Sequence, residues 1–163
     1  MIYSRTSEYA IRALSYIASK QNKSRATVEE ISLNTKVPMA YIAKIFQCLV
    51  KAKILRSYRG PNGGYALISD PHQLSLMKII QALDDARQSP LSHCIMGFAF
   101  CSSEKPCPVH DIWATAKEKI CNKLSESTVL DMVKLNGQFR SHGQKRIKLS
   151  KNMRDVFHGL NQA

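Results

Sequence analysis

Three cysteines and one histidine gather in a stretch of the sequence that shows neither helical nor strand periodicity. Cys94, Cys101 and Cys107 are separated by six and five residues, and His110 follows Cys107 by one helical turn. Thiolates are the soft ligands that iron–sulfur clusters and zinc require, and a loop can wrap around a cluster where a helix cannot. The spacing therefore predicts a metal site on these four side chains.

The spacing does not identify the metal by itself. Structural zinc sites commonly pair ligands about 2 to 4 residues apart, and neither cysteine interval matches, so an iron–sulfur cluster is favoured over zinc. A helix that starts near Pro108 favours the thiolate form that binds metal. Redox-active thiols without a metal remain an alternative. The other two cysteines, Cys48 and Cys121, flank apolar stripes and are predicted to be small core residues.

An enzyme is the competing class of function, because a thiol can act as a nucleophile or as a redox group. Cys107, His110 and Asp111 stand close together in the sequence, but their spacing at the start of a helix suits ligation better than a catalytic triad. The sequence also contains no glycine-rich nucleotide-binding loop. We therefore expect a protein that is not an enzyme.

The charge of the chain indicates a polyanionic partner. Of its 163 residues, 24 are Lys or Arg and 12 are Asp or Glu, which gives a formal net charge of +12. Residues 1–70 contain 11 basic and 4 acidic side chains, residues 71–135 contain 7 of each, and residues 136–163 contain 6 and 1. This distribution favours nucleic acid as the partner of the N-terminal segment. The sequence shows no membrane-spanning or secretory segment, so we expect a cytoplasmic protein without a membrane partner.

The basic N-terminal segment is predicted to form a winged helix-turn-helix. Apolar residues at helical spacing predict a helix over about residues 4–19. Thr27 and Glu30 form a capping-box pattern, in which each side chain accepts from the other residue's backbone N–H, and this pattern opens a second helix. A third helix has Pro38 in its first turn and extends to about Ala52. Its buried side is predicted to be one apolar stripe of Met39, Ile42, Phe46, Leu49 and Val50. The short connection between these two helices is typical of a helix-turn-helix.

A β-hairpin after the third helix supplies the wing. Residues 54–59 and 65–68 have strand character, and the turn between them is rich in glycine. We expect the third helix to read the major groove, while the first helix and the wing hold the backbone or the minor groove. The predicted DNA-binding residues are Ser4, Arg5, Thr6, Pro38, Ala40, Tyr41, Lys44, Gln47, Arg59, Gly60, Pro61, Asn62 and Gly63.

Residues 71–135 are predicted to carry the sensor and the dimer contacts. Ser75 is predicted to cap a helix that runs out at Asp84 and Asp85. The cysteine loop covers about residues 88–107, and a long amphipathic helix starts at Pro108. Because the winged helix closes its own core, we expect the long helix to pack against a second subunit. A short helix follows near Thr128, and residues 136–163 are expected to form a basic, flexible tail. The expected fold is thus mainly α-helical, with a two-stranded wing and a long dimerisation helix.

Several segments together resemble the family of iron–sulfur cluster regulators (IscR) and nitrite-sensitive repressors (NsrR). The likeness covers about residues 1–135. The segments that carry it are the run Ser4-Arg5-Thr6-Ser7-Glu8-Tyr9-Ala10, the helix around Tyr41, the wing Arg59-Gly60-Pro61-Asn62-Gly63-Gly64-Tyr65, and the cysteine loop that ends in Cys107-Pro108-Val109-His110-Asp111-Ile112-Trp113.

The resemblance implies a homodimeric transcription regulator that binds a palindromic operator in double-stranded DNA. It also implies an iron–sulfur cluster on the three loop cysteines. Family members with a [2Fe–2S] cluster use a histidine as fourth ligand, which would be His110. Members with a [4Fe–4S] cluster use an acidic residue near the N-terminus of the partner subunit, which would be Glu8. Both residues are present, so the cluster type stays open.

The function that follows is a DNA-binding regulator, acting as a repressor, that senses nitric oxide, redox state or iron supply through the cluster. One alternative is a regulator of the same fold that holds no metal and senses through its thiols or a small ligand. A thiol-dependent redox enzyme is a further alternative.

Overall fold

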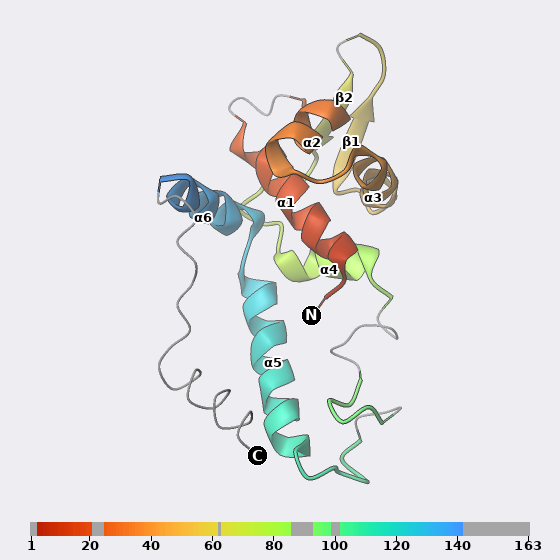
Figure 1. Ribbon diagram of the computed structural model, residues 1–163, viewed down its shortest axis with the longest axis vertical. Helices are drawn as coiled ribbons and strands as arrows, with labels where there is room; N and C mark the ends of the chain where they lie inside the picture. Colours follow the sequence, from red (N-terminus) through yellow and green to blue (C-terminus); the bar gives the residue numbers. More distant parts are fainter. Residues whose placement is uncertain (1–2, 21–24, 62, 86–92, 99–101, 142–163) are drawn as a thin grey trace, which may run out of the picture.

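Six helices and one two-stranded antiparallel sheet make up the part of the chain that the structure describes (Figure 1). The computed structural model describes residues 3–20, 25–61, 63–85, 93–98 and 102–141, with the backbone alone from residue 136 on. The predicted architecture, mainly helical with a two-stranded wing, is confirmed. In chain order the elements are α1 (Arg5–Ser19), α2 (Val28–Thr35), α3 (Met39–Lys51), β1 (Leu55–Tyr58), β2 (Gly64–Leu67), α4 (Leu76–Leu83), α5 (His110–Glu126) and α6 (Val129–Ser141).

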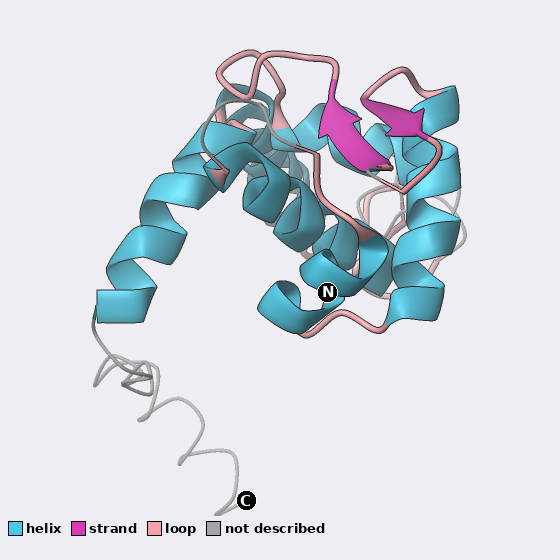
Figure 2. Ribbon diagram, turned by 90° about the horizontal axis from the view of Figure 1, so that it is seen from above, coloured by secondary structure: helices cyan, strands magenta, loops and turns pink. Residues whose placement is uncertain are grey.

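Helix α1 lies at the centre of the molecule and contacts α2, α3, α4, α6 and β2. In both views α3 and the strands lie on one side of α1, and α6 lies on the other (Figures 1 and 2). The small side chains of Ala10 and Ala13 let neighbouring helices approach closely, while Leu14 and Ile17 fill the space between them. Burial of a leucine or isoleucine side chain contributes about 1.5–3 kcal/mol. This face of α1 therefore contributes a large share of the free energy gained by burying the apolar core.

The helices of the helix-turn-helix begin and end close to the predicted residues. Thr27 caps α2 by accepting a hydrogen bond from the backbone N–H of Glu30 at 3.2 Å. Helix α2 ends at Lys36, whose backbone lies in the left-handed region with φ 57°. Pro38 directly precedes α3, and a second left-handed lysine, Lys53 (φ 57°), turns the chain out of it. Left-handed backbone at a residue other than glycine thus ends α2 and turns the chain after α3.

Helix α3 buries one side against the core and exposes the other. Two residues predicted for the buried side, Met39 and Cys48, are exposed, so this part of the prediction is wrong. At about 100° per residue, Cys48 rotates out of the buried stripe, and Met39 at the first helical position extends past the edge of the core. The buried residues of α3 are Ile42, Ile45, Phe46 and Leu49.

The wing is fixed to the body through the main chain and one aromatic pair. In the hairpin, Tyr58 stands opposite Gly64. Tyr65 and Ala26 exchange two backbone hydrogen bonds, with N to O distances of 2.9 and 3.0 Å. The Tyr65 ring packs edge-on against Phe46 of α3, with ring centroids 4.7 Å apart. Gly64 has φ 137°, and a Cβ there would lie 2.7 Å from the Ala26 carbonyl oxygen, so this close approach requires glycine.

Helices α4, α5 and α6 extend the molecule beyond the winged helix. Ser75 caps α4 as predicted, and it forms an antiparallel bridge to Thr128, the residue before α6. Val129 anchors α6 in the core. Helix α6 continues past residue 136, where the flexible tail was expected to start, and residues 142–163 lie outside the described residues. Helix α5 projects from the body, and its N-terminal end lies far from α3 and the strands (Figure 1).

The apolar side chains of α5 are only partly covered within the chain. Ile112 is 77% exposed, and Trp113, Ile120 and Cys121 are half-buried. Cys121, which was predicted to be a core residue, is therefore only partly buried. No helix in the described ranges has both the length and the apolar character that crossing a lipid bilayer requires.

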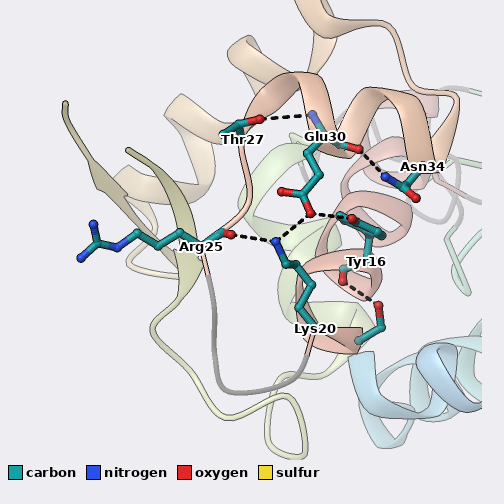
Figure 3. A network of polar contacts seen from close by, with 7 residues as sticks. Tyr16, Lys20, Arg25, Thr27, Glu30 and Asn34 are labelled. Atoms are coloured by element: carbon teal, nitrogen blue, oxygen red, sulfur yellow. Dashed lines mark hydrogen bonds and ion pairs between the residues drawn. The ribbon is translucent and has the colours of Figure 1, made fainter. Parts of the chain in front are cut away.

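A polar network joins the end of α1 to α2 (Figure 3). Glu30 Oε1 accepts hydrogen bonds from Lys20 Nζ and from the Tyr16 hydroxyl, both at 2.7 Å. Lys20 Nζ also donates to the Arg25 carbonyl at 2.9 Å. The bond from Lys20 lowers the pKa of the Glu30 carboxyl, the Tyr16 bond acts in the same direction, and burial opposes both. The network thus stabilises the ionised carboxylate in the folded state.

Glu30→Gln is expected to lower the free energy of unfolding at neutral pH by about 0.5–1 kcal/mol, a modest value because solvent screens the pair. The folded-state pKa lies below the unfolded value of about 4.3, so the carboxylate contributes its stability above that value and loses it as pH falls through the folded-state pKa. Urea denaturation at a series of pH values measures the effect. The gap between wild type and variant should close in acid.

The control is Glu29→Gln, which changes an exposed carboxylate on the same helix. It should unfold like the wild type within about 0.5 kcal/mol. A Glu30→Gln gap of the same size in acid and at neutral pH would contradict the role of the ionised carboxylate.

Candidate DNA interface and cysteine site

The outward side of α3 gathers most of the residues that the sequence predicts to contact bases. Pro38, Ala40, Lys44 and Gln47 are exposed, and Tyr41 is 55% exposed. They lie on one surface because the opposite side of the helix is fixed in the core. The surface carries amide, hydroxyl and ammonium groups, which can bond to base edges and phosphates.

The start of α1 presents Arg5 and Thr6, but the third predicted contact in this run is engaged within the chain. Ser4 caps α1 by accepting from the backbone N–H of Ser7 at 3.1 Å. The Ser4 hydroxyl also donates to Asp84 Oδ1 at 2.5 Å, and the Ser7 hydroxyl donates to the same oxygen at 2.9 Å. Asp84 at the end of α4 therefore positions the start of α1. No sequence pattern indicated this pairing, because the residues are distant in the chain.

The tip of the wing exposes Arg59, Gly60 and Pro61, while Asn62 lies outside the described residues. Gly60 has φ 100°, and its carbonyl accepts from the Gly63 N–H at 2.8 Å, which closes the turn. A Cβ on Gly63 would lie 2.6 Å from the Tyr58 carbonyl oxygen. The glycines thus allow a tight turn that holds Arg59 outward.

A further cation beside the wing was missed in the sequence. The Arg25 guanidinium lies over the Tyr58 ring, with its central carbon 3.7 Å from the ring centroid. A cation that stacks on an aromatic ring is held in place. Arg25 could have been suspected from its position before the capping residue Thr27, but only the fold brings it next to β1.

The cysteine site combines Cys94 and Cys107. Their Sγ atoms are 3.8 Å apart, and both side chains, together with His110, line an open pocket of about 670 Å³. Cys94 is 7% exposed and Cys107 is half-buried. His110 begins α5, and its Nε2 lies 3.5 Å from the Ser103 hydroxyl. Cys101, the remaining predicted ligand, lies outside the described residues, which contain no complete group of three metal-binding side chains.

The surroundings of Cys94 favour its thiolate. A hydrogen bond from the backbone of Met96 lowers the pKa of the Cys94 thiol, burial opposes this, and the Cys107 thiol and the backbone of Phe98 lower it further. The ammonium of Lys117 on α5 adds a smaller attraction. A thiolate is both the metal-binding and the nucleophilic form of cysteine.

Trp113 ties the cysteine segment to α5. Its Nε1 donates to the carbonyl of His93, the residue before Cys94, at 3.0 Å. The Lys117 ammonium lies 5.9 Å from the centroid of the Trp113 ring. The sequence indicated only that Trp113 belongs to the apolar pattern of the long helix. Residue spacing does not reveal the hydrogen-bond partner of an indole N–H.

Glu8, the alternative fourth ligand, does not line the pocket of its own chain. Its carboxylate pairs with Arg12 at 3.6 Å. The Arg12 guanidinium also donates to the Thr35 carbonyl at the end of α2. Within one chain, Glu8 thus helps to fix the helix-turn-helix.

Over most of its length the chain runs from the helix-turn-helix through the wing and the cysteine segment to the long helix. The Rrf2 family, described as iron-dependent transcriptional regulators, matches residues 3–135. The chain belongs to the Rrf2 family. The resemblance to IscR regulators is confirmed with it, because relatives of this Rrf2 chain carry that name.

Two relatives and one solved structure illustrate the similarity. A protein of Aquifex aeolicus (strain VF5), named among the HTH-type transcriptional regulators, is 31% identical over 83% of this chain and 93% of its own length. The HTH-type transcriptional regulator IscR of Vibrio atlanticus (strain LGP32) is 27% identical over 88% of this chain and 82% of its own. The structure of CymR, the global cysteine regulator of B. subtilis, has a TM-score of 0.68 at 19% identity, over 83% of this chain and 98% of that chain. This last likeness concerns the fold alone.

Trp113→Phe is expected to expose Cys94 in the metal-free, reduced protein. The change keeps an aromatic ring and removes the N–H that holds the His93 carbonyl, a bond worth about 1 kcal/mol. The rate of Cys94 alkylation should therefore rise about fivefold. Mass spectrometry of the modified peptides measures it.

The exposed Cys48 in the same sample provides the internal control, because its rate should not change. If Cys94 and Cys48 kept their wild-type ratio of rates, Trp113 would have no part in closing the cysteine site.

Proposed function

We propose that this Rrf2 protein is a homodimeric DNA-binding repressor that senses nitric oxide, redox state or iron supply through an iron–sulfur cluster. The cluster would be held by Cys94, Cys101 and Cys107. The fourth ligand would be His110 for a [2Fe–2S] cluster, or Glu8 of the partner subunit for a [4Fe–4S] cluster. The names of the IscR relatives and the family description support this proposal.

One observation carries the proposal: the Cys94 and Cys107 sulfurs lie 3.8 Å apart in a pocket that His110 also lines. Two thiolates bound at about 2.3 Å to one tetrahedral metal ion are separated by about 3.8 Å. The two described thiols thus fit two ligands of one metal ion, as on the two-cysteine iron of a [2Fe–2S] cluster. In a [4Fe–4S] cluster each iron takes a single thiolate, so this spacing supports the [2Fe–2S] form. The lowered pKa of Cys94 favours the thiolate form, which binds metal.

The DNA-binding part follows from α3 and the wing. In a dimer, two recognition helices would enter successive major grooves of a palindromic operator, about 34–36 Å apart. The incompletely covered apolar side of α5, with Ile112 77% exposed, supports a second subunit as its partner. Residues 1–70 would bind DNA, residues 71–135 would sense and dimerise, and residues 136–163 would form a basic tail.

The chain's own residues would link the two parts. When bound, the cluster supplies a redox-active centre that reacts with nitric oxide or oxygen. Trp113 holds the segment of Cys94 on α5, and Asp84 joins the end of α4 to Ser4 and Ser7 at the start of α1. A change in the cysteine segment would reach α1 through α4. Coupling between two sites of this kind is typically worth about 1–3 kcal/mol.

A metal-free thiol sensor is the second candidate, and the same 3.8 Å contact favours it. Oxidation of the Cys94 and Cys107 thiols by hydrogen peroxide would join the two sulfurs in a disulfide and reduce the peroxide to water. The structural neighbour CymR bears the name of a cysteine regulator.

Anaerobic purification separates these two candidates. The protein should be brown and should contain iron and acid-labile sulfide in equal amounts. Cys94→Ala, Cys101→Ala and Cys107→Ala should each lose most of both, whereas Cys48→Ala is the matched control and should keep them. His110→Ala and Glu8→Ala, compared by iron content and absorption spectrum, distinguish the two fourth ligands.

Operator affinity before and after treatment with nitric oxide provides the functional measurement. We expect a change of about 5- to 150-fold and a steep fall of affinity with salt. Colourless protein without iron, whose operator affinity responds to peroxide through Cys94 and Cys107, would replace the cluster by the thiol sensor. Affinity that ignored nitric oxide, oxygen and peroxide alike would contradict both candidates.

A further inference from the structure

We propose that the first turn of α3 recognises thymine through its 5-methyl group. Met39, Ala40 and Tyr41 form an exposed apolar platform at the point where a recognition helix meets the base edges. This inference rests on the proposed function, because it requires α3 to lie in the major groove. It names the chemistry by which the operator is read.

The platform is exposed although the rest of α3 is firmly packed. Met39 is 45% exposed and Tyr41 is 55% exposed, while Ile42 is completely buried and Ile45 is 3% exposed. The apolar groups of the first turn therefore face outward because of the direction of the helix in the core, and not because the helix is loosely attached. About half of the surface of Met39 and of Tyr41 therefore stays uncovered in the folded chain.

The chemistry of the first turn selects among the base edges. Of the groups in the major groove, the thymine methyl is the apolar one, and alanine or other apolar side chains contact it. Asp and Glu, which accept from the cytosine amino group, are absent from the whole of α3. Arg is absent from it as well, so the bidentate guanidinium contact to guanine cannot form here. The apolar groups of the first turn are thus suited to the thymine methyl group.

Tyr9 of α1 holds the Tyr41 ring in place. The two rings meet edge to face, with centroids 5.7 Å apart and an angle of 77° between their planes. Tyr9 is itself packed against the core, and such pairs favour one orientation of the ring. Tyr9 is therefore a positioning residue for the platform, although it makes no predicted contact with DNA.

The next turn of α3 changes from apolar to polar. Lys44 and Gln47 are exposed there. Lysine donates to the O6 and N7 atoms of guanine, and glutamine pairs with the N6 and N7 atoms of adenine. A half-site read by α3 should thus combine thymine opposite the first turn with purines opposite the second.

Replacement of thymine by deoxyuridine tests the inference without altering the protein. The operator is first selected with the full-length protein from a randomised library of duplex DNA. Each thymine is then changed singly to deoxyuridine, which removes the methyl group and keeps the base pair. At one or two thymines in each half-site the Kd should rise about fourfold, the value of one buried methyl group. Thymines outside the half-sites serve as controls and should show no change.

Variants of the protein identify the side chain that contacts each thymine methyl group. In Met39→Ala or Tyr41→Ala the uridine penalty should disappear at the thymine that the altered side chain covers. Leu33→Ala is the matched control, because Leu33 is an apolar residue of α2 that is 82% exposed, and it should keep the penalty. Tyr9→Leu should reduce the penalty at the Tyr41 position, while Tyr9→Phe, which retains the ring, should restore it.

The outcomes separate this inference from the proposed function. Selective, salt-dependent operator binding with no uridine penalty inside the half-sites would overturn thymine recognition and leave the regulator intact. A penalty that persisted in both the Met39→Ala and Tyr41→Ala variants would also overturn it. Failure to select any operator would overturn the DNA-binding function, and the inference with it.

Discussion

Burial of one face of α1 is the constraint on which the rest of the molecule depends. The helices α2, α3, α4 and α6 and the strand β2 all contact α1, so the direction of each is set by the shape of the same apolar surface. Ala10 and Ala13 keep this surface narrow. A larger side chain at either position would push two neighbouring elements apart together, because close-packed cores lack space for added atoms. The direction of α3, and hence the surface that it exposes, is a consequence of this packing.

The two candidate sites are held by different kinds of interaction. The DNA interface lies on elements fixed by the buried core and by main-chain bonds, such as those between Ala26 and Tyr65. Among the described residues of the cysteine segment, Cys94 alone is buried, and the indole bond of Trp113 ties that segment to α5. Segments with few buried contacts open at lower free energy than the core. Such a division suits a rigid surface for reading DNA and an adjustable segment for chemistry.

The sequence predicted those features that repeat or that have local causes. Helical periodicity located α1 and α3, and the capping residues Thr27 and Ser75 located α2 and α4, because both signals depend on neighbours within one helical turn. The cysteine and histidine positions were likewise visible as residue types. What the sequence could not show depends on distant partners.

The missed features illustrate this limit. Asp84 meets Ser4 across the fold, Arg25 stacks on Tyr58, and Tyr9 packs against Tyr41. The errors at Met39 and Cys48 have a related cause, because periodicity gives the apolar stripe but not the extent of the core that receives it. In each case the missing information was the relative placement of two elements.

Lys36 and Lys53 each meet two requirements that favour different residue types. Each has left-handed backbone, which glycine adopts at a cost lower by on the order of 1 kcal/mol. Each is also exposed beside an end of α3, where a cation attracts a polyanion. Substitution of either lysine by glycine would therefore raise the amount of folded protein in the cell and lower the occupancy of the operator. Selection for heat stability should favour glycine at these two positions, whereas selection for binding to a weaker operator should favour lysine.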